Sequence, residues 1–383
     1  MMQYRTLGRT GIRVSEIGMG CEGMLEKPYE TVLEYVNAME RLGVNCMDMY
    51  APNPEFRAHL GRAMEGRREK FVLQAHIGSI WQNGQYKRTR DIGEVREGFA
   101  EQLRLLRTDY ADVGMIHYVD SLTDWAEIEN GPVLAQAIEW KKQGVIRSIG
   151  LSSHNPVVAL AAVNTGLIDV LMFSVNPCYD LQPASEDVEE LWAEKNYAGE
   201  LVNMDPDRQL LYETCQRLGV GITVMKAFGG GDLLKADLSP AQAALTHVQC
   251  IQYALDRPGV CSVLCGARTV QELEQNAAFE ESAAEARDYA SALAAFPRIS
   301  WQGHCMYCSH CAPCPAEISV ADVTKFLNLA QAQGFVPETV REHYALLAHK
   351  AGECIQCGAC ETRCPFGVDI RKNMRTAKEV FGC

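Results

Sequence analysis

The chain has 383 residues, of which 47% are hydrophobic and 22% charged, and its formal net charge is −13. This composition is typical of a globular protein, and the acid excess excludes nucleic acid as a ligand because phosphate binding needs a concentrated basic surface. No apolar run reaches the roughly 20 residues of a membrane-spanning helix, and residues 1–14 lack the apolar core of a secretory signal, so we expect a cytoplasmic protein that does not bind a membrane.

Short apolar or β-branched segments recur eight times in the first 270 residues, and helical patterns separate them. In one such pattern, residues 91–107, Val95, Phe99, Leu103 and Leu106 recur at three- and four-residue spacing, which is typical of an amphipathic helix. Eight βα units predict an α/β fold, a closed (β/α)8 TIM barrel of parallel strands with helices outside. The predicted strands span 14–20, 43–50, 70–78, 111–120, 146–154, 169–177, 221–230 and 260–268.

An open doubly wound sheet is the alternative for this α/β pattern. Such sheets carry a G-x-G-x-x-G turn before a helix, whereas "GMGCEGM" follows the first predicted strand here. Residues 4–14 alternate around a Gly-containing turn, which indicates a hairpin that closes the barrel floor. The segment from 178 to 206 is too long for a simple βα turn, so we expect a lid or substrate wall with a short helix over 185–197.

Catalytic groups of a parallel barrel lie at the carboxyl ends of its strands. In this sequence those ends are polar and rich in proton-transfer groups. Asp48 and Tyr50 are two residues apart on one strand, so their side chains point to the same face. We therefore expect chemistry that involves proton transfer at this end of the barrel. The ring consists of Asp48, Tyr50, His76, His117, Tyr118, Ser152, Ser153, His154, Asn176, Lys226, Gly266 and Arg268.

Eight of the 16 cysteines form two dense motifs near the C-terminus. The second motif, "CIQCGACETRCP", has the C-x2-C-x2-C-x3-C-P spacing that binds a [4Fe–4S] cluster in bacterial ferredoxins, where the fourth cysteine ligates the other cluster. We therefore expect two [4Fe–4S] clusters with crossed ligands. Four-thiolate zinc sites are the alternative, but they rarely place four close cysteines before a proline twice in one chain. The predicted ligand sets are Cys305, Cys308, Cys311 and Cys364, and Cys354, Cys357, Cys360 and Cys314.

Two predicted helices, over 319–334 and 337–352, join the cysteine motifs, and each stops at a glycine. The sequence therefore predicts a barrel domain over 1–296 and a small, mainly helical ferredoxin-like two-cluster domain over 297–383. Two adjacent clusters are most simply explained as a path for single electrons, with a purely structural role as the alternative.

The barrel sequence resembles the aldo/keto reductases, and the whole chain resembles the branch of that family with a C-terminal ferredoxin domain. The marks that carry the resemblance are, in chain order, "MD", "DVGMIHYVD", "GLSSH", "FSVNP" and "VLCGARTVQELEQN". The resemblance implies NAD(P)-linked chemistry on a small carbonyl or hydroxyl compound. In that chemistry a tyrosine, assisted by Asp, Lys and His, protonates the developing alkoxide while hydride adds to carbon.

Two of the four family positions differ in this chain. Asp48 and His117 match the family's Asp and His, but Asn53 stands at the tyrosine position and His76 at the lysine position. A neutral amide cannot act as a general acid, so the proton must come from another group. We expect Tyr50 or His76 to supply it, because Tyr50 faces the same side as Asp48 and histidine ordinarily titrates near neutral pH. The predicted catalytic residues are Asp48, Tyr50, His76 and His117.

The resemblance also implies a binding site for NAD(P). The Gly-rich segment 227–234 offers backbone amides to a pyrophosphate, with a plain βα loop as the alternative. Arg268 would meet a 2′-phosphate through paired hydrogen bonds, or would be an ordinary surface arginine. The implied contacts are Ser152, Ser153 and Asn176 at the nicotinamide, and Gly266, Arg268 and Asn276 near the adenosine.

Two functions stay open on the sequence alone. The first is an oxidoreductase of a small carbonyl or hydroxyl compound whose clusters exchange electrons with the substrate or with an electron-transfer protein. The second is an electron-transfer or assembly subunit whose barrel has lost hydride chemistry. Asn53 and His76 favour the second function, whereas Asp48, Tyr50 and His117 favour the first. We favour the first, with a remodelled proton-transfer site.

Overall fold

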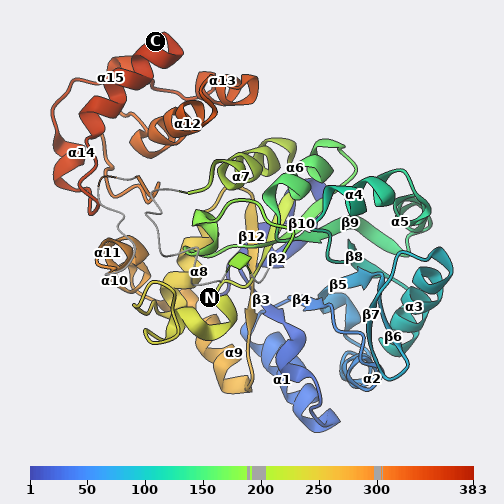
Figure 1. Cartoon of the computed structure of the whole chain (residues 1–383). Helices are drawn as coiled ribbons and strands as arrows, with labels where there is room; N and C mark the ends of the chain where they lie inside the picture. Colours follow the sequence, from blue (N-terminus) through green and yellow to red (C-terminus); the bar gives the residue numbers. More distant parts are fainter. Residues whose placement is uncertain (188–189, 192–203, 297–302, 304) are drawn as a thin grey trace.

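A computed structural model of the chain shows a closed barrel of eight parallel strands that carries a helical C-terminal domain (Figure 1). The structure describes residues 1–187, 190–191, 204–296, 303 and 305–383. The predicted (β/α)8 barrel is confirmed, and the strands close in the order β10-β11-β12-β3-β4-β5-β8-β9. They are β3 (Ile17–Gly20), β4 (Cys46–Met49), β5 (Val72–Ile77), β8 (Ala111–Ile116), β9 (Ile146–Ser153), β10 (Val170–Ser174), β11 (Gly221–Met225) and β12 (Val260–Gly266).

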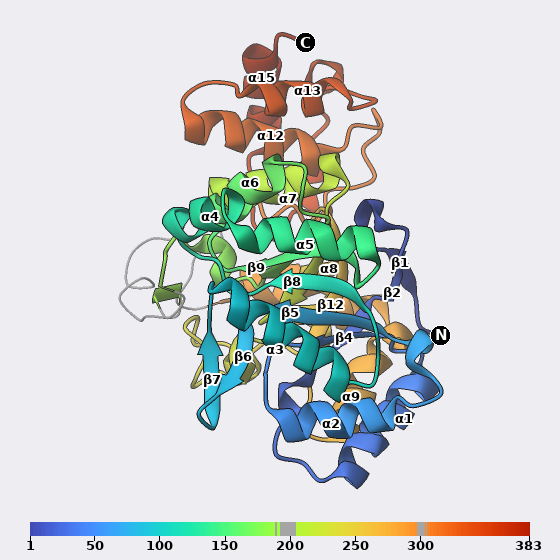
Figure 2. The same ribbon diagram turned by 90° about the vertical axis from the view of Figure 1, so that its right-hand side faces the viewer.

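Helices cover the outside of the barrel (Figures 1 and 2). Their ends follow local sequence signals: the first helix ends at Gly43, which adopts a left-handed conformation with φ 77°, and the third begins after Asp91, whose side chain accepts the Glu94 N–H. The helices are α1 (Tyr29–Leu42), α2 (Pro54–Ala63), α3 (Ile92–Leu105), α4 (Leu122–Glu129), α5 (Pro132–Gln143), α6 (Pro156–Asn164), α7 (Pro206–Leu218), α8 (His247–Leu255), α9 (Val270–Ala277), α10 (Ala284–Arg287) and α11 (Tyr289–Ala294).

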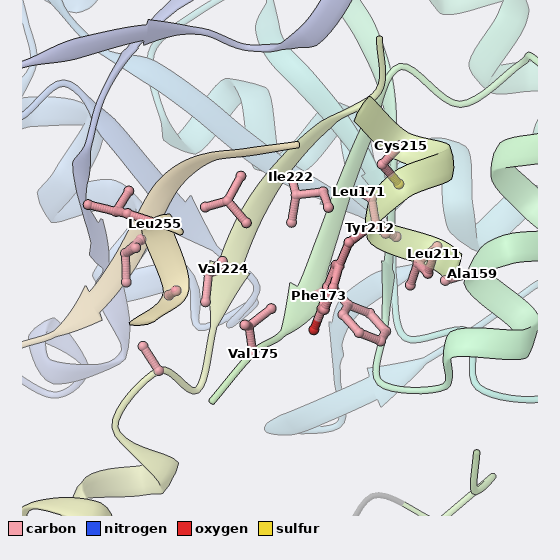
Figure 3. Packing of buried hydrophobic residues seen from close by; sticks show 14 of the residues in the cluster. Ala159, Leu171, Phe173, Val175, Leu211, Tyr212, Cys215, Ile222, Val224 and Leu255 are labelled. Carbon is pink, nitrogen blue, oxygen red and sulfur yellow. The ribbon is translucent and has the colours of Figure 1, made fainter. Parts of the chain in front are cut away.

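The space between strands and helices is filled by the outward-facing side chains of the strands (Figure 3). On β10, Leu171 and Phe173 are fully buried, and Phe173 meets the ring of Tyr212 on α7 edge to face, with centroids 6.1 Å apart. Burial of each such side chain contributes about 1.5–3 kcal/mol. This packing fixes which side chains of the same strands point inward, because alternate residues of a strand face opposite sides.

The lower part of the lumen is filled by a separate apolar cluster. Strands β1 (Tyr4–Thr6) and β2 (Arg13–Ser15) pair antiparallel below it, and Leu7, Ile12 and Val14 of this hairpin are buried in the cluster. The predicted hairpin at the barrel floor is therefore confirmed. Above this floor, the Thr223 hydroxyl donates to Gln74 Oε1 across the lumen at 2.9 Å.

A second hairpin, β6 (Ser79–Gln82) with β7 (Gln85–Arg88), follows β5 and is absent from the sequence-based expectations. Its two-residue turn is Asn83–Gly84, with φ of 54° and 76°, which is the backbone of a type I′ turn. The sequence signal was therefore present as Asn-Gly. The hairpin is fixed to α3, because Lys87 Nζ contacts Glu94 at 2.6 Å and Ile80 packs over Gly98.

The C-terminal domain consists mainly of helices: α12 (Val320–Gln333), α13 (Glu338–Ala345), α14 (Ala359–Thr362) and α15 (Ile370–Phe381). The predicted helix over 319–334 is confirmed. The predicted helix over 337–352 is wrong in its second half, since α13 ends at Ala345. There the chain turns back, and the Tyr344 hydroxyl accepts the Ala351 N–H at 3.0 Å while Glu353 accepts the Lys350 N–H at 2.9 Å.

The C-terminal domain packs against the barrel through α12 and α7, as Figure 2 shows. At this contact the buried Lys325 ammonium lies 2.6 Å from Glu213 of α7 and 2.9 Å from Asp322. Burial alone would lower the pKa of Lys325, but the two carboxylates raise it. The charged contact therefore helps to fix the position of the second domain on the first.

Two expectations concern segments at the edge of the described residues. The predicted helix over 185–197 lies largely outside them, and the domain boundary at 296/297 stays a prediction. Within the described part of the chain, no helix has the length and apolar character needed to cross a membrane.

The contact between the β6–β7 hairpin and α3 leads to a stability prediction. A Cβ at Gly98 would lie 2.3 Å from the Ile80 Cγ2 atom, so Gly98→Ala forces the hairpin away from α3 and costs about 1–3 kcal/mol. In an Ile80→Ala background only the Cβ of residue 80 remains, 3.2 Å from the added Cβ, so the same change should cost less, and the helix propensity of alanine offsets part of the remaining cost. Urea denaturation of the four proteins measures this difference in cost. Equal effects in both backgrounds would show that the hairpin does not rest on α3.

Candidate functional site

Three neighbouring strands each place a proton-transfer side chain at the carboxyl end of their row of inward-facing residues. Asp48 is the last inward-facing residue of β4, His76 is the last inward-facing residue of β5, and His117 follows β8. The parallel register pairs Asp48 with Gln74 and His76 with Met115, so each of the three groups stands one step further along its strand than its neighbour. The three side chains therefore lie side by side at the mouth of the lumen, and all are buried.

The three groups form a continuous chain of hydrogen bonds. The Asp48 Oδ1 atom lies 2.8 Å from His76 Nε2, and His76 Nδ1 lies 2.7 Å from His117 Nδ1. The chain continues to a residue that the sequence analysis did not single out, because the Tyr86 hydroxyl lies 2.9 Å from His117 Nε2. Tyr86 belongs to the β6–β7 hairpin, so its place in the site follows from the Asn-Gly turn described above.

The direction of these bonds follows from the chemistry of the groups. A carboxylate only accepts, so His76 donates its Nε2–H to Asp48. Burial lowers the pKa of His117 well below its usual value, and the neighbouring His76 and Arg90 lower it further, so His117 carries a single proton. With one proton on each imidazole, His117 donates Nδ1–H to His76 Nδ1, and His117 Nε2 accepts the Tyr86 O–H.

Tyr50 lies in the same site, in contact with His117. Its ring is parallel to the His117 imidazole, with centroids 6.2 Å apart, and its hydroxyl donates to Glu22 Oε1 at 3.1 Å. Burial raises the pKa of Tyr50, and the carboxylates of Glu22 and Asp48 raise it further. The structure thus brings together Asp48, Tyr50, His76 and His117, while the phenol of Tyr50 is directed at a carboxylate.

The Asn53 side chain, predicted from the sequence resemblance to stand at the family's tyrosine position, has a structural role. It caps α2, where its amide oxygen accepts the Phe56 N–H at 2.9 Å. Asn53 therefore supplies no proton donor to the space beside His76 and His117.

The residues that the resemblance implies at the nicotinamide differ in how many of their polar atoms already have hydrogen-bond partners in the protein. Asn176 Oδ1 accepts two backbone N–H groups and its Nδ2 donates to the Lys226 carbonyl, so this amide holds the loop after β10. Ser153 Oγ donates to Asp120. Ser152 Oγ accepts the Tyr118 N–H at 2.8 Å, and its own hydroxyl proton has no acceptor among the described residues.

The residues implied near the adenosine are more open. Gly266 is exposed, and Asn276 Nδ2 donates to its carbonyl at 3.4 Å. The Arg268 guanidinium is exposed and has no ion-pair partner within the described ranges. In the Gly-rich loop, Gly230 and Gly231 have φ of 72° and 103°, and no atom lies within 4 Å of their Cβ positions. This edge of the barrel therefore fits the phosphates of a dinucleotide, whose charge is negative.

The eight motif cysteines surround two hollows, four to each. One hollow is lined by Cys305, Cys308, Cys311 and Cys364. The other is lined by Cys314, Cys354, Cys357 and Cys360. Each set combines the first three cysteines of one motif with the last of the other.

The loops that carry the cysteines share an unusual backbone. In both motifs the residue before the second cysteine and the residue after it have positive φ: Tyr307 and Ser309 in the first, Gln356 and Gly358 in the second. This turns backbone N–H groups toward sulfur. Burial raises the pKa of the Cys305 thiol, whereas a hydrogen bond from the Tyr307 N–H lowers it. Such donors stabilise the thiolate form that iron binds.

The arrangement of the thiols fits a cluster better than a single ion. Across residues 1–187, 190–191, 204–296, 303 and 305–383, no three His, Cys, Asp or Glu side chains converge as they would on one metal ion. Four thiols around a hollow match a [4Fe–4S] cube, whose iron atoms lie at separate corners. The donor set therefore fits iron–sulfur clusters.

Comparison with known protein families agrees with both parts of the structure. The Aldo/keto reductase family profile matches residues 16–249, and the 4Fe-4S dicluster domain profile matches residues 304–369. The chain thus belongs to the aldo/keto reductase family and is an oxidoreductase that also carries a 4Fe-4S dicluster domain at its C-terminus.

Individual relatives have low sequence identity to this chain, but they match most of its length. The uncharacterized oxidoreductase YqkF of Bacillus subtilis is 27% identical over 298 residues, which cover 72% of this chain and 90% of the relative. L-galactose dehydrogenase of Arabidopsis thaliana is 24% identical over 302 residues, covering 72% and 88%. Among solved structures, the aldo-keto reductase AKR11C1 from Bacillus halodurans in its holo form matches with a TM-score of 0.59 at 22% identity, covering 76% and 95%. This last likeness supports the barrel fold.

Iron content tests the grouping of the cysteines. Cys364→Ala, Cys308→Ala and Cys357→Ala should each remove one of two clusters, and so about half of the iron. Cys364→Ala combined with Cys308→Ala should lose no more than either single variant, because both residues line one hollow. Combined with Cys357→Ala it should lose nearly all iron. The reverse pattern, measured by iron assay after anaerobic purification, would show that the fourth cysteines are not crossed.

The pKa of His117 gives a prediction on pH. Because the folded state lowers this pKa, the unfolded chain binds a proton below about pH 6.5 that the folded state refuses. The His117 contribution to stability should therefore fall as the pH drops below that value, by at most about 1.4 kcal/mol per pH unit. Urea denaturation at several pH values should show a weaker acid dependence for His117→Gln than for the wild type. Identical dependences would contradict the account.

Proposed function

We propose that the barrel catalyses NAD(P)-linked reduction of a small carbonyl compound, or the reverse oxidation of a hydroxyl compound. We also propose that its two [4Fe–4S] clusters exchange electrons with an electron-transfer protein. The observation that carries the first part is the buried hydrogen-bonded chain from Asp48 through His76 to His117. Catalytic groups of such barrels lie at the carboxyl ends of the strands. Hydrogen-bonded titratable side chains at that position can transfer protons to and from a substrate.

A bound nicotinamide cofactor would supply the hydride. The protein must then deliver a proton to the substrate oxygen, and His76 is suited to hold it. A second proton on His76 would be stabilised by the Asp48 carboxylate at 2.8 Å. When His76 holds this second proton on Nδ1, the His117 proton lies on Nε2 instead of Nδ1. His76 can then pass its Nδ1 proton to His117 Nδ1 over 2.7 Å, while His117 releases the proton on Nε2 toward the mouth of the lumen.

The substitution of histidine for the family's lysine explains why such a relay exists. An ammonium group has a single nitrogen, whereas an imidazole has two nitrogens that face different partners. His76 uses one for Asp48 and the other for His117. Tyr50 supports the relay from the side, because its ring lies parallel to His117.

The cofactor would lie along the edge from Ser152 to Arg268. The Ser152 hydroxyl proton is placed to meet the carboxamide, and the exposed Arg268 guanidinium to meet a phosphate. Ser153, Asn176 and Asn276 would act through the loops that they hold. Binding of the cofactor thus needs few direct side-chain contacts.

The two cysteine sites differ in exposure, which supports an order for electron transfer. Cys357 and Ile355 of the second motif are exposed, Ile355 by 65%, so the cluster there would face a partner protein. Cys311 of the first motif is buried, and on the barrel side the Arg257 guanidinium donates to the Tyr289 hydroxyl at 3.1 Å near the same site. Together the two clusters would carry as many electrons as one hydride.

Binding and turnover test this proposal. Anaerobically purified protein should quench or shift the fluorescence of NADH or NADPH in a saturable titration. It should also oxidise the cofactor in the presence of a carbonyl probe such as 4-nitrobenzaldehyde. His76→Ala should lower kcat by about 10²–10⁴-fold, because the relay is broken, with cluster absorbance unchanged.

A matched control is Lys142→Ala, which removes an exposed charge on α5, outside both the relay and the β6–β7 hairpin. It should bind the cofactor as the wild type does. If intact clusters are accompanied by no nicotinamide binding at all, the barrel has lost hydride chemistry and the electron-transfer or assembly function holds instead.

A further inference from the structure

The hydrogen-bonded chain in the barrel ends on a phenol that comes from outside the barrel strands. Tyr86 lies on β7, and its hydroxyl is 2.9 Å from His117 Nε2. The hairpin that carries it is tied to the site at two points: Ser79 donates to the Tyr50 carbonyl at 2.6 Å, and Arg88 donates to the Tyr118 carbonyl at 2.8 Å. The position of this phenol is therefore fixed by the fold.

Among the described residues, three phenols surround His117, and one of the three is hydrogen-bonded to it. Tyr50 stacks on the imidazole and donates to Glu22. Tyr118 is tilted against His117, with ring centroids 6.2 Å apart, and contacts His154. Tyr86 alone meets the edge of the imidazole, at an interplanar angle of 81°, with its oxygen at Nε2. Among the three, it is the phenol that can exchange a proton with the relay.

Tyr86 is also accessible, unlike the relay behind it. The side chains of His76 and His117 are nearly fully buried, whereas Tyr86 is 44% exposed. A substrate oxygen at the mouth of the lumen can therefore approach the phenol while the imidazoles stay shielded.

The charged side chains near Tyr86 and Tyr50 favour Tyr86 as the phenol that ionises. Burial raises the pKa of Tyr86, but Arg88 and Arg90 oppose that shift, because two guanidinium groups stabilise a phenolate. Burial raises the pKa of Tyr50 as well, and there Glu22 and Asp48 add to the shift. A phenolate at Tyr50 would face carboxylates.

We propose that Tyr86 is a catalytic residue, the group that gives a proton to the substrate oxygen in reduction and takes it back in oxidation. It would thus replace the donor that the family keeps at the position of Asn53. This inference rests on the proposed function, because it assigns the last step of the proton path of that reaction. The site would accept small aldehydes, ketones or the corresponding alcohols.

The step balances in protons and electrons. In reduction, a bound reduced nicotinamide would supply the hydride, whose electron pair forms the new C–H bond as the C=O π bond breaks. Tyr86 gives its O–H proton to the oxygen. This step uses the relay charged with one extra proton, in which His76 carries a proton on each nitrogen and the His117 proton lies on Nε2 instead of Nδ1. The phenolate takes the His117 Nε2 proton, and His117 Nδ1 takes the His76 Nδ1 proton. The relay thus returns to its resting state, with His76 protonated on Nε2 and His117 on Nδ1, and solvent supplies the next extra proton.

Tyr86→Phe tests the assignment by removing only the hydroxyl. With NADPH or NADH and 4-nitrobenzaldehyde, kcat should fall by about 10²–10⁴-fold while the Kd of the cofactor stays within about twofold of the wild type. Gln85→Ala, on the same hairpin and exposed, is the matched control and should keep wild-type turnover. Tyr50→Phe should lower kcat much less than Tyr86→Phe.

A second measurement is independent of turnover. In protein labelled with ¹³C at tyrosine Cζ, the Tyr86 signal, assigned by its absence in Tyr86→Phe, should shift in His117→Gln because the hydrogen-bond partner is lost. Wild-type kcat in Tyr86→Phe, or an unchanged Tyr86 signal in His117→Gln, would overturn the assignment. A wild-type protein that neither binds nicotinamide nor turns over would instead refute the proposed function, and the Tyr86 signal would still report whether the phenol is bonded to His117.

Discussion

The hydrogen bond between the His76 imidazole and the Asp48 carboxylate is the interaction on which the site depends. It fixes which nitrogen of His76 faces inward, and so it leaves the other nitrogen to His117. The bond exists because Asp48 on β4 is in register with Gln74 on β5, and His76 is the next residue of β5 whose side chain points into the lumen. A lysine at the same position would pair with Asp48 but would end the chain there.

Much of this could be predicted from the sequence, since strand alternation is a local signal. Asp48, His76 and His117 each end an apolar segment, and that pattern predicted the eight strands and the grouping of these residues. Tyr86 was missed because its role depends on the length of a hairpin and on its fold against α3. The Asn-Gly pair at 83–84 marked the turn, but no local pattern shows where the hairpin tip points.

For the cysteine motifs, unlike Tyr86, the spacing along the sequence is enough to predict the local structure. Short C-x2-C loops force a tight backbone, and the same positive φ occurs before and after the second cysteine of both motifs. The end of α13 at Ala345 was not predictable in this way, because it depends on the Tyr344 hydroxyl and its distant partner Ala351. Side chains that bond across a turn leave little trace in residue periodicity.

The central claim is that His117 links His76 to Tyr86 through its two ring nitrogens. The most direct measurement is a long-range ¹H–¹⁵N correlation spectrum of anaerobic protein labelled with ¹⁵N-histidine at neutral pH. The account predicts a neutral His117 ring, with a proton on Nδ1 and a bare Nε2 whose shift changes in Tyr86→Phe. A His117 ring protonated on Nε2 alone, with a signal unaffected by Tyr86→Phe, would contradict it.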